Sequence, residues 1–113
     1  MLQKIDWQLA DNTSVLVDLK DVYCTYEMDK FLEFKEDEII NYIDLKERLY
    51  KRSAKDYTME IDFQNNVCTF TFPKEGNCQF DCLSNLEITA GQINIKYEFA
   101  DEVKLITIKM KEE

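Results

Sequence analysis

Four cysteines are the side chains of this chain best suited to chemistry: Cys24, Cys68, Cys78 and Cys82. Structural zinc sites usually take cysteines in close pairs, and only Cys78 and Cys82 form one. Along an extended strand, residues four apart lie about 13 Å from each other, so these two thiols could share an ion only at a sharp bend. The spacing favours four reduced thiols and leaves a metal or redox role as the alternative.

The chain contains no histidine, which narrows the reactions open to it. It lacks the usual general base near neutral pH and the usual metal ligand. Catalytic sites of the Ser-His-Asp and Cys-His types are excluded. Carboxylate pairs such as Asp81 with Glu87, or Glu36 with Glu38, could do acid-base work, but such pairs arise by chance among 23 acidic residues. We therefore expect no enzymatic activity, no catalytic residue, no cofactor and no metal.

The composition argues against nucleic acid and membrane partners. Asp and Glu number 23 against 14 Lys and Arg, and the resulting net charge of -9 repels phosphate backbones and anionic lipid head groups. No apolar run approaches the roughly 18 residues that span a bilayer, and the amino-terminal stretch lacks the apolar block of a secretory signal. Without such a signal, we expect the protein in the cytoplasm. From a length of 113 residues we expect one domain, over residues 1-113.

Alternation of apolar and polar residues predicts β-strands along most of the chain. Runs on either side of Asn65-Asn66 predict a hairpin, and the run from Cys78 to Ile88 predicts one long strand. The alternation changes phase near Asp21, which predicts a β-bulge or bend. The remaining expected strands hold Ile5 to Leu9, Val15 to Leu19, Phe31 to Phe34, Ile93 to Phe99 and Ile106 to Met110. Reversals of direction are expected where residues tolerate positive φ, at Asp11-Asn12, Asn65-Asn66, Gly76-Asn77 and Ala90-Gly91.

The segment from Asp37 to Asp56 fits neither pattern cleanly. Its residues are good helix formers, yet its apolar side chains would spread over roughly 220° of a helix, too wide for an amphipathic stripe. If the segment is a strand, Ile39 and Ile43 lie on the same face as the polar Asn41. The pattern alone leaves helix and strand open.

Several short motifs in fixed order resemble the YwiB-like family of small bacterial proteins, which have a calycin-like β-barrel and no established function. They are RLYKRS at 48-53, MEIDF at 59-63, FTFPKEG at 70-76, CLSNLEI at 82-88 and INIKYEF at 93-99. The resemblance covers Lys30 to Lys111. It departs from the family pattern at Ser53, where a Gly is expected, and at Lys46-Glu47, where neither residue is a good turn former.

The resemblance implies an all-β fold, a single antiparallel calycin- or lipocalin-like β-barrel of about eight strands. In such a barrel, Glu38 to Leu45 and Arg48 to Lys51 are strands. Arg48, Tyr50 and Arg52 then share one face. These basic residues either pair with acidic neighbours and shield a sheet edge, or one arginine points into the barrel and holds an anionic group.

The interior of a small barrel is either packed by its own side chains or holds one small ligand. The residues expected inside suit both cases: Trp7, Tyr57, Met59, Phe70, Phe80, Tyr97 and Phe99. One hypothesis is a non-enzymatic carrier or sensor of a small apolar or anionic ligand, contacted by Arg52, Tyr97, Ser84, Trp7 and Phe70. The other is an interaction module with a filled core, which binds a protein partner or a second copy through surfaces with exposed apolar residues such as Leu83 and Leu105.

Overall fold

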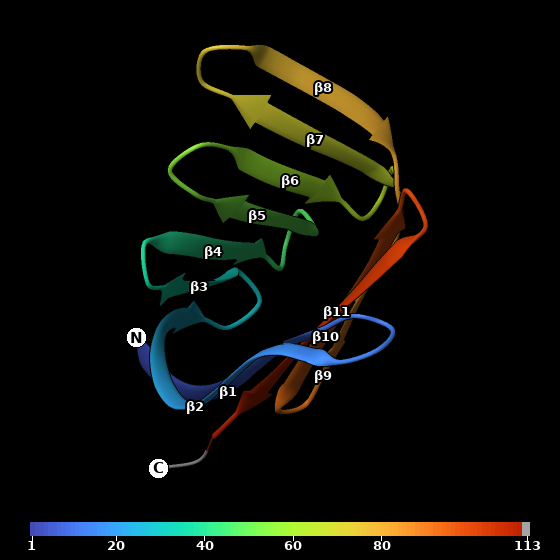
Figure 1. Cartoon of the computed structure of the whole chain (residues 1–113). Coiled ribbons are helices and arrows are strands. Elements are labelled where there is room, and N and C mark those ends of the chain that lie inside the picture. Colours follow the sequence, from blue (N-terminus) through green and yellow to red (C-terminus); the bar gives the residue numbers. More distant parts are fainter. Residues whose placement is uncertain (112–113) are drawn as a thin grey trace.

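The computed structural model describes residues 1-111, which form eleven β-strands and no helix (Figure 1). The strands are β1 (Leu2–Ala10), β2 (Val15–Glu27), β3 (Phe31–Glu36), β4 (Ile39–Asp44), β5 (Leu49–Ser53), β6 (Thr58–Asp62), β7 (Val67–Phe72), β8 (Gly76–Asp81), β9 (Leu83–Thr89), β10 (Gln92–Phe99) and β11 (Glu102–Met110). No helix in this range has the length and apolar character needed to cross a membrane.

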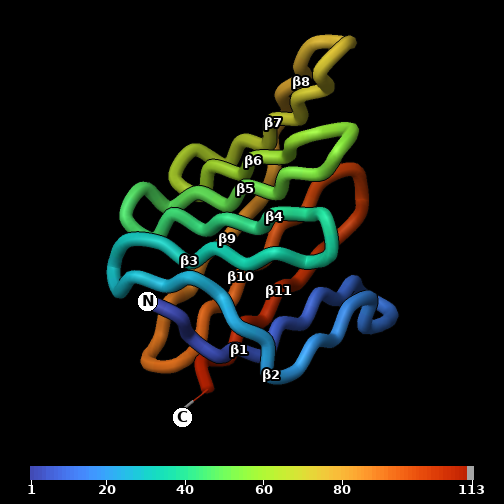
Figure 2. The backbone as a smooth tube through the Cα atoms, turned by 90° about the vertical axis from the view of Figure 1, so that its left-hand side faces the viewer, coloured from blue at the N-terminus to red at the C-terminus, as the bar shows by residue number. Residues whose placement is uncertain are grey.

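All eleven strands belong to one antiparallel sheet that curls until it is nearly closed into a barrel (Figures 1 and 2). Strands β1 to β8 follow one another as neighbours, as do β9 to β11, and the pairing of β1 with β11 joins the two series. The two sheet edges are therefore β8 and β9. The expected all-β class with one antiparallel sheet is confirmed, but the sheet has eleven strands where about eight were expected.

The predicted bulge near Asp21 is present in β2. Between the pairs Ile5 with Val22 and Trp7 with Leu19, β2 carries one extra residue, and Asp21 has a φ of 53°. The predicted reversals are also found, with positive φ at Asn66 and Gly91. The reversal expected at Gly76-Asn77 lies slightly upstream of these residues, because Gly76 is already the first residue of β8. Turn-forming Asp and Asn thus replace the glycines that this chain largely lacks.

The ambiguous segment from Asp37 to Asp56 folds as the two strands β4 and β5, so the helical alternative is wrong. Ile43 and Tyr50 pair across these strands and both are fully buried. Lys46 and Glu47 do form the turn, because Asp44 accepts hydrogen bonds from both of their backbone N–H groups. Arg48 lies in that turn with a φ of 58° and precedes β5, which corrects the expectation that it begins a strand beside Tyr50 and Arg52.

The single long strand expected from Cys78 to Ile88 is wrong, because the chain breaks at Cys82 into β8 and β9. The residues before the break pair with β7, and those after it pair with β10. This short crossing carries the chain from one edge of the sheet to the other (Figure 1). The alternation of apolar residues continues across the break, so the pattern could not reveal it.

The core lies inside the curled sheet. Large side chains fill it without exposure, among them Trp7, Ile5, Leu32, Ile43, Tyr50, Ile61, Ile93, Ile95, Ile106 and Ile108. Of the residues expected inside, Trp7, Met59 and Tyr97 are buried, and Tyr57, Phe70, Phe80 and Phe99 are partly buried against the core. Leu83 and Leu105 are exposed, as expected. Burial of these apolar surfaces is the main force that holds the sheet curled.

Candidate functional site

A buried polar network lies on the inner face of β3, β4 and β5. Asn41 is the one buried polar or charged residue of the described chain, and its Oδ1 accepts hydrogen bonds from the hydroxyl of Tyr50 at 2.7 Å and from Nη1 of Arg52 at 3.1 Å. The same Arg52 nitrogen lies 3.2 Å from Oε1 of Glu36. Cross-strand pairing of Asn41 with Arg52 brings these side chains together.

The charges of this network are matched and largely withdrawn from water. The Arg52 and Glu36 side chains are only 14% and 12% exposed, in contrast to most ion pairs of the chain. Burial alone would lower the pKa of Arg52, but Tyr50, Glu36 and Tyr57 together raise it, so the guanidinium stays protonated. Burial raises the pKa of Tyr50 to about 12, so its hydroxyl remains a hydrogen-bond donor.

An aromatic cluster continues from this network along β6, β7, β8 and β10. We define it by its members, which are Tyr57, Phe70, Phe72, Phe80, Tyr97 and Phe99. Phe70 lies at its centre, with ring centroids 5.9 Å from Tyr57, 6.2 Å from Phe72, 5.7 Å from Phe80 and 6.0 Å from Phe99. Tyr97 and Phe99 stack at 6.1 Å. All of these except the buried Tyr97 remain partly exposed.

The aromatic cluster meets the polar network at Tyr97. Its ring lies 6.4 Å from that of Tyr50, and burial, followed by the proximity of Tyr50, raises the pKa of the Tyr97 hydroxyl. Among residues 1-111, the buried side-chain polar atom without a hydrogen-bond partner is Nε1 of Trp7, so the Tyr97 hydroxyl, which has no protein partner in this range, is within reach of solvent. A phenolic donor thus stands between a protonated guanidinium and a partly exposed set of rings, an arrangement suited to a molecule with an apolar body and a polar end.

The structure brings four of the five predicted ligand contacts together, and three of them belong to the polar network or the aromatic cluster. Arg52 lies in the polar network, while Tyr97 and Phe70 belong to the aromatic cluster. Ser84 lies directly across from Tyr97 in the pairing of β9 with β10, but its backbone N–H and its hydroxyl both donate to Oδ1 of Asn66 and are therefore already used. Trp7 is fully buried against Phe34, with ring centroids 5.0 Å apart, and is core.

Sequence reasoning missed Asn41, Tyr50 and the pairing of Glu36 as parts of this site. The signal for Asn41 was a polar residue on a parity otherwise held by apolar residues, which indicates a buried polar group that requires partners. Glu36 drew attention only as one of two neighbouring acids. Its actual partners, Arg52 and Asn41, lie on two other strands.

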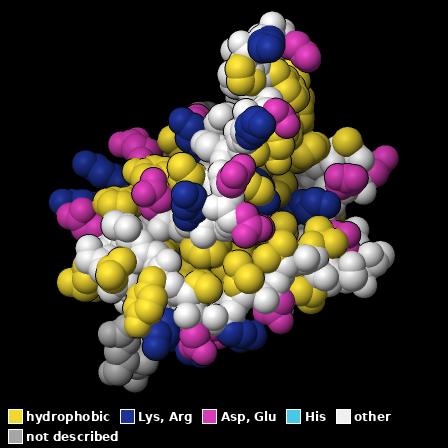
Figure 3. All heavy atoms as spheres, turned by 60° about the vertical axis from the view of Figure 1, so that its left-hand side comes forward, with side chains coloured by type: hydrophobic (Ala, Val, Ile, Leu, Met, Phe, Trp, Pro, Cys, Tyr) yellow, Lys and Arg dark blue, Asp and Glu magenta, His cyan; other side chains and the backbone are white. Residues whose placement is uncertain are grey.

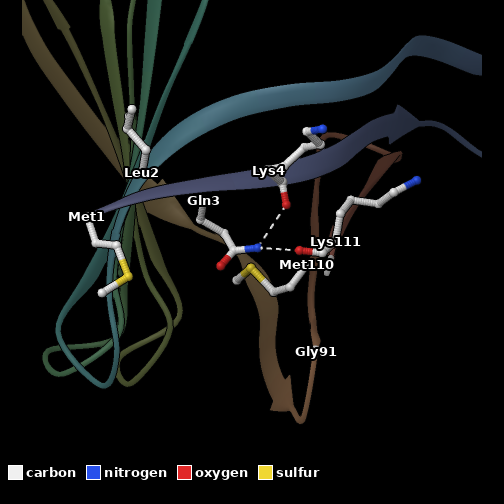
Figure 4. Close-up of a pocket in the computed structure, with 7 residues that line it drawn as sticks. All are labelled: Met1, Leu2, Gln3, Lys4, Gly91, Met110 and Lys111. Carbon is white, nitrogen blue, oxygen red and sulfur yellow. Dashed lines mark hydrogen bonds between the residues drawn. The ribbon is translucent and has the colours of Figure 1, made fainter. Parts of the chain in front are cut away.

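A surface pocket lies away from this site, between the amino-terminal residues and the end of β11 (Figure 4). It encloses about 640 Å³ and is open to solvent. Gln3 donates hydrogen bonds to the backbone oxygens of Lys4 at 3.0 Å and Lys111 at 2.8 Å, whereas both lysine side chains point away from the pocket. Lys111 is already paired with Asp6 and Asp21.

The cysteines are all free thiols, three buried and one, Cys78, exposed. Within residues 1-111, no three Cys, Asp or Glu side chains are grouped closely enough to hold a metal ion. No protein-family model, curated protein or solved structure matches the chain.

Proposed function

We propose that the chain is a non-enzymatic binding protein that holds one small, mainly apolar molecule against the aromatic cluster. The observation that carries the proposal is the unpaired Tyr97 hydroxyl between partly exposed rings and the buried guanidinium of Arg52. The rings supply apolar contact, and the hydroxyl supplies one directional hydrogen bond. The bound molecule lies at the exposed side of the cluster, because large side chains already fill the interior around Trp7.

The polar network favours a ligand whose polar end is a neutral acceptor over one that is fully anionic. Glu36 already neutralises Arg52, and its carboxylate would repel a second negative charge brought to the same place. A carbonyl or hydroxyl group would accept a hydrogen bond from Tyr97 without that repulsion. The proposal therefore departs from the hypothesis that an arginine in the barrel holds an anionic group.

We also infer that the nearly closed barrel is of the calycin-like class found in the YwiB-like family. What supports this inference is a single antiparallel sheet of consecutive strands, in which the first strand β1 pairs with the last strand β11. Calycin-type barrels commonly bind small ligands inside or at the opening. Four free thiols are consistent with a reducing compartment, so we assign the protein to the cytoplasm.

Fluorescence titration with Nile red tests the site with an uncharged aromatic probe whose polar end is a carbonyl acceptor. We expect saturable binding to one site, weakened about tenfold by Phe70→Leu, because that change removes the ring at the centre of the cluster. Phe31→Leu is the matched control, since Phe31 stacks on Tyr42 at 5.7 Å outside the cluster. Equal loss in both variants, or binding without saturation, would contradict the proposal.

A ligand carried through purification gives an independent test. Native mass spectrometry of gently purified protein should show an adduct of constant mass, and Tyr97→Phe should reduce its occupancy. This change removes only a hydroxyl, so the aromatic contacts remain. A clean apo mass that persists after addition of small apolar compounds would instead favour a second function.

That second function is a protein interaction module without a ligand. The filled interior favours it, because twelve large side chains are less than 2% exposed and leave the core to the protein itself. In this case the partly exposed rings are the rim of the core. The two functions differ in the titration, since an interaction module would show no saturable site for the aromatic probe.

A further inference from the structure

Strand β8 has one edge without a partner. It pairs with β7 along Gly76 to Asp81, and the sheet ends there. Alternate residues of an edge strand direct their backbone N–H and C=O groups away from the neighbouring strand. In β8 these groups are exposed, since five of its six residues are exposed and only Phe80 is half-buried. The β7–β8 hairpin also projects beyond the other strands (Figure 2).

This edge lacks the features that usually prevent a strand from pairing with another chain. Lysine, proline, bulges or covering loops protect most exposed edges. Between Gly76 and Phe80 the strand has no charged residue and no proline, and Asp81 at its end is the single charge of β8. No bulge interrupts its pairing with β7. Six residues of regular strand are thus available for pairing.

We propose that β8 pairs antiparallel with the β8 strand of a second copy of this chain, around a two-fold axis that joins the two sheets into one. Charge argues for this occupant. The chain carries a net charge of -9, so two copies repel each other over most of their surfaces, but the segment Gly76 to Phe80 is free of charge. A basic partner would require acidic groups at the edge, and this segment has none.

The side chains of the hairpin favour the same pairing. Cys78 and Phe80 lie opposite Phe70 and Cys68, so they share the inner face of the hairpin with Phe72. Phe72 is 36% exposed, and hydrophobic side chains gather below the tip of this hairpin (Figure 3). Two copies paired through β8 would bring two such faces side by side and bury part of both. Pairing centred near Cys78 would also place it close to its counterpart in the second copy.

The dimer would lie beside Phe72 and Phe80 of the aromatic cluster, but its test changes Gln79, which alternates with Phe80 and lies on the opposite face of β8. Failure of the ligand proposal would leave the dimer untouched. Loss of the dimer would likewise leave the saturable site of each copy in place.

Sedimentation equilibrium of the full chain over a range of concentrations tests the proposal. We expect a monomer–dimer equilibrium that Gln79→Lys weakens at least about tenfold, because the introduced amines of the two copies approach each other at the axis. Asn85→Lys adds the same charge to the exposed face of β9 and should leave association unchanged. If Gln79→Lys does not fold, as judged by circular dichroism, the exposed Asn77→Lys takes its place.

Three outcomes of sedimentation would overturn the proposal. They are a protein that remains monomeric at every concentration, a dimer that both β8 variants leave intact, and an equal loss of association in Asn85→Lys. A protein that binds an unrelated extended peptide but itself stays monomeric would also overturn the proposal, because it shows the first of these outcomes.

Thiol cross-linking tests the geometry of the dimer. A short bis-maleimide should link two copies through Cys78, the only exposed cysteine of the described residues. Cys78→Ser should abolish the cross-link and change the dissociation constant of the dimer, measured by sedimentation, by less than about twofold. A dimer that forms in solution but cannot be cross-linked through Cys78 would place the interface elsewhere and overturn the proposal.

Discussion

The two edges of the sheet are finished in different ways. The edge of β9 is capped by side chains from distant turns: Arg48 donates a hydrogen bond to the backbone oxygen of Leu86, and Asn66 accepts one from the backbone N–H of Ser84. The backbone oxygen of Asn66 also accepts from Cys82, 2.9 Å away. The edge of β8 has no comparable side-chain cap among residues 1-111.

This difference shows how a sheet can stop short of full closure without exposing both of its edges. At β9, two turn residues satisfy backbone groups that would otherwise require a neighbouring strand. These residues hold the edge against the turns before β5 and β7. At β8, the same backbone groups face solvent and remain able to pair. The contrast separates an edge that completes the fold from one that is open to a partner.

Thiol reactivity should give the largest difference between the two edges. Cys78 on β8 is exposed, whereas Cys82, immediately before β9, and Cys68 on β7 are buried. Burial raises the pKa of Cys68 to about 12, so at pH 8 its thiolate fraction is on the order of 1 in 10,000. Iodoacetamide at pH 8 should therefore modify Cys78 far sooner than the others, as peptide mass mapping would show. Comparable rates at Cys78 and Cys68 would mean that the described burial is wrong.

Asn66→Ala should produce the largest loss of stability among changes at the capped edge. It removes the acceptor for the Ser84 N–H and hydroxyl and places alanine at a φ of 54°. We expect the free energy of unfolding to fall by about 2 kcal/mol in urea denaturation. Asn66→Asp is the matched control, because aspartate keeps an acceptor and tolerates positive φ. A loss as large in the control would show that the cap is not responsible.

Arg48→Ala should have a smaller effect at the same edge. The variant leaves the Leu86 oxygen without its side-chain donor, and we expect a loss of about 1 kcal/mol. Lys51→Ala removes the same charge from an exposed site on β5 and should change stability by less than about 0.5 kcal/mol. If both variants lose the same stability, net charge would explain the effect better than the cap does.

Gln79→Lys should have the smallest effect on the stability of the monomer. The substitution removes one exposed hydrogen bond to Thr69, 3.2 Å long, from the uncapped edge. In dilute solution, where the chain is monomeric, we expect the free energy of unfolding to change by less than about 0.5 kcal/mol. A loss comparable to that of Asn66→Ala would mean that β8 already has a structural partner within the monomer.

Much of the strand structure could be predicted from sequence. Alternation predicted the hairpin of β6 and β7, and a change of phase predicted the bulge at Asp21. Alternation works because it records which side of a strand is buried, a local property of each residue. The same limitation explains the failure at Cys82, where the chain changes neighbours but not its buried side.

The candidate site was only partly predictable. Tyr97 and Phe70 were predicted to face inward and Arg52 to be a ligand contact, but Ser84 had the inward parity as well and is used at the edge of β9. Parity places a side chain on a face and does not say what it meets there. Asn41 showed this most clearly, since its polar character appeared as an irregularity of the strand pattern until its partners were known.

The sequence by itself determined where strands form, where most turns fall and which side of each strand is apolar, because these depend on neighbours within a few residues. Only the tertiary structure decided that Arg48 reaches Leu86, 38 positions away, and that Asn66 caps Ser84, 18 positions away. It also decided that Glu36, Asn41, Tyr50 and Arg52 form one network. Such contacts arise from the curl of the whole sheet, which brings distant segments together and leaves no periodic trace along the chain.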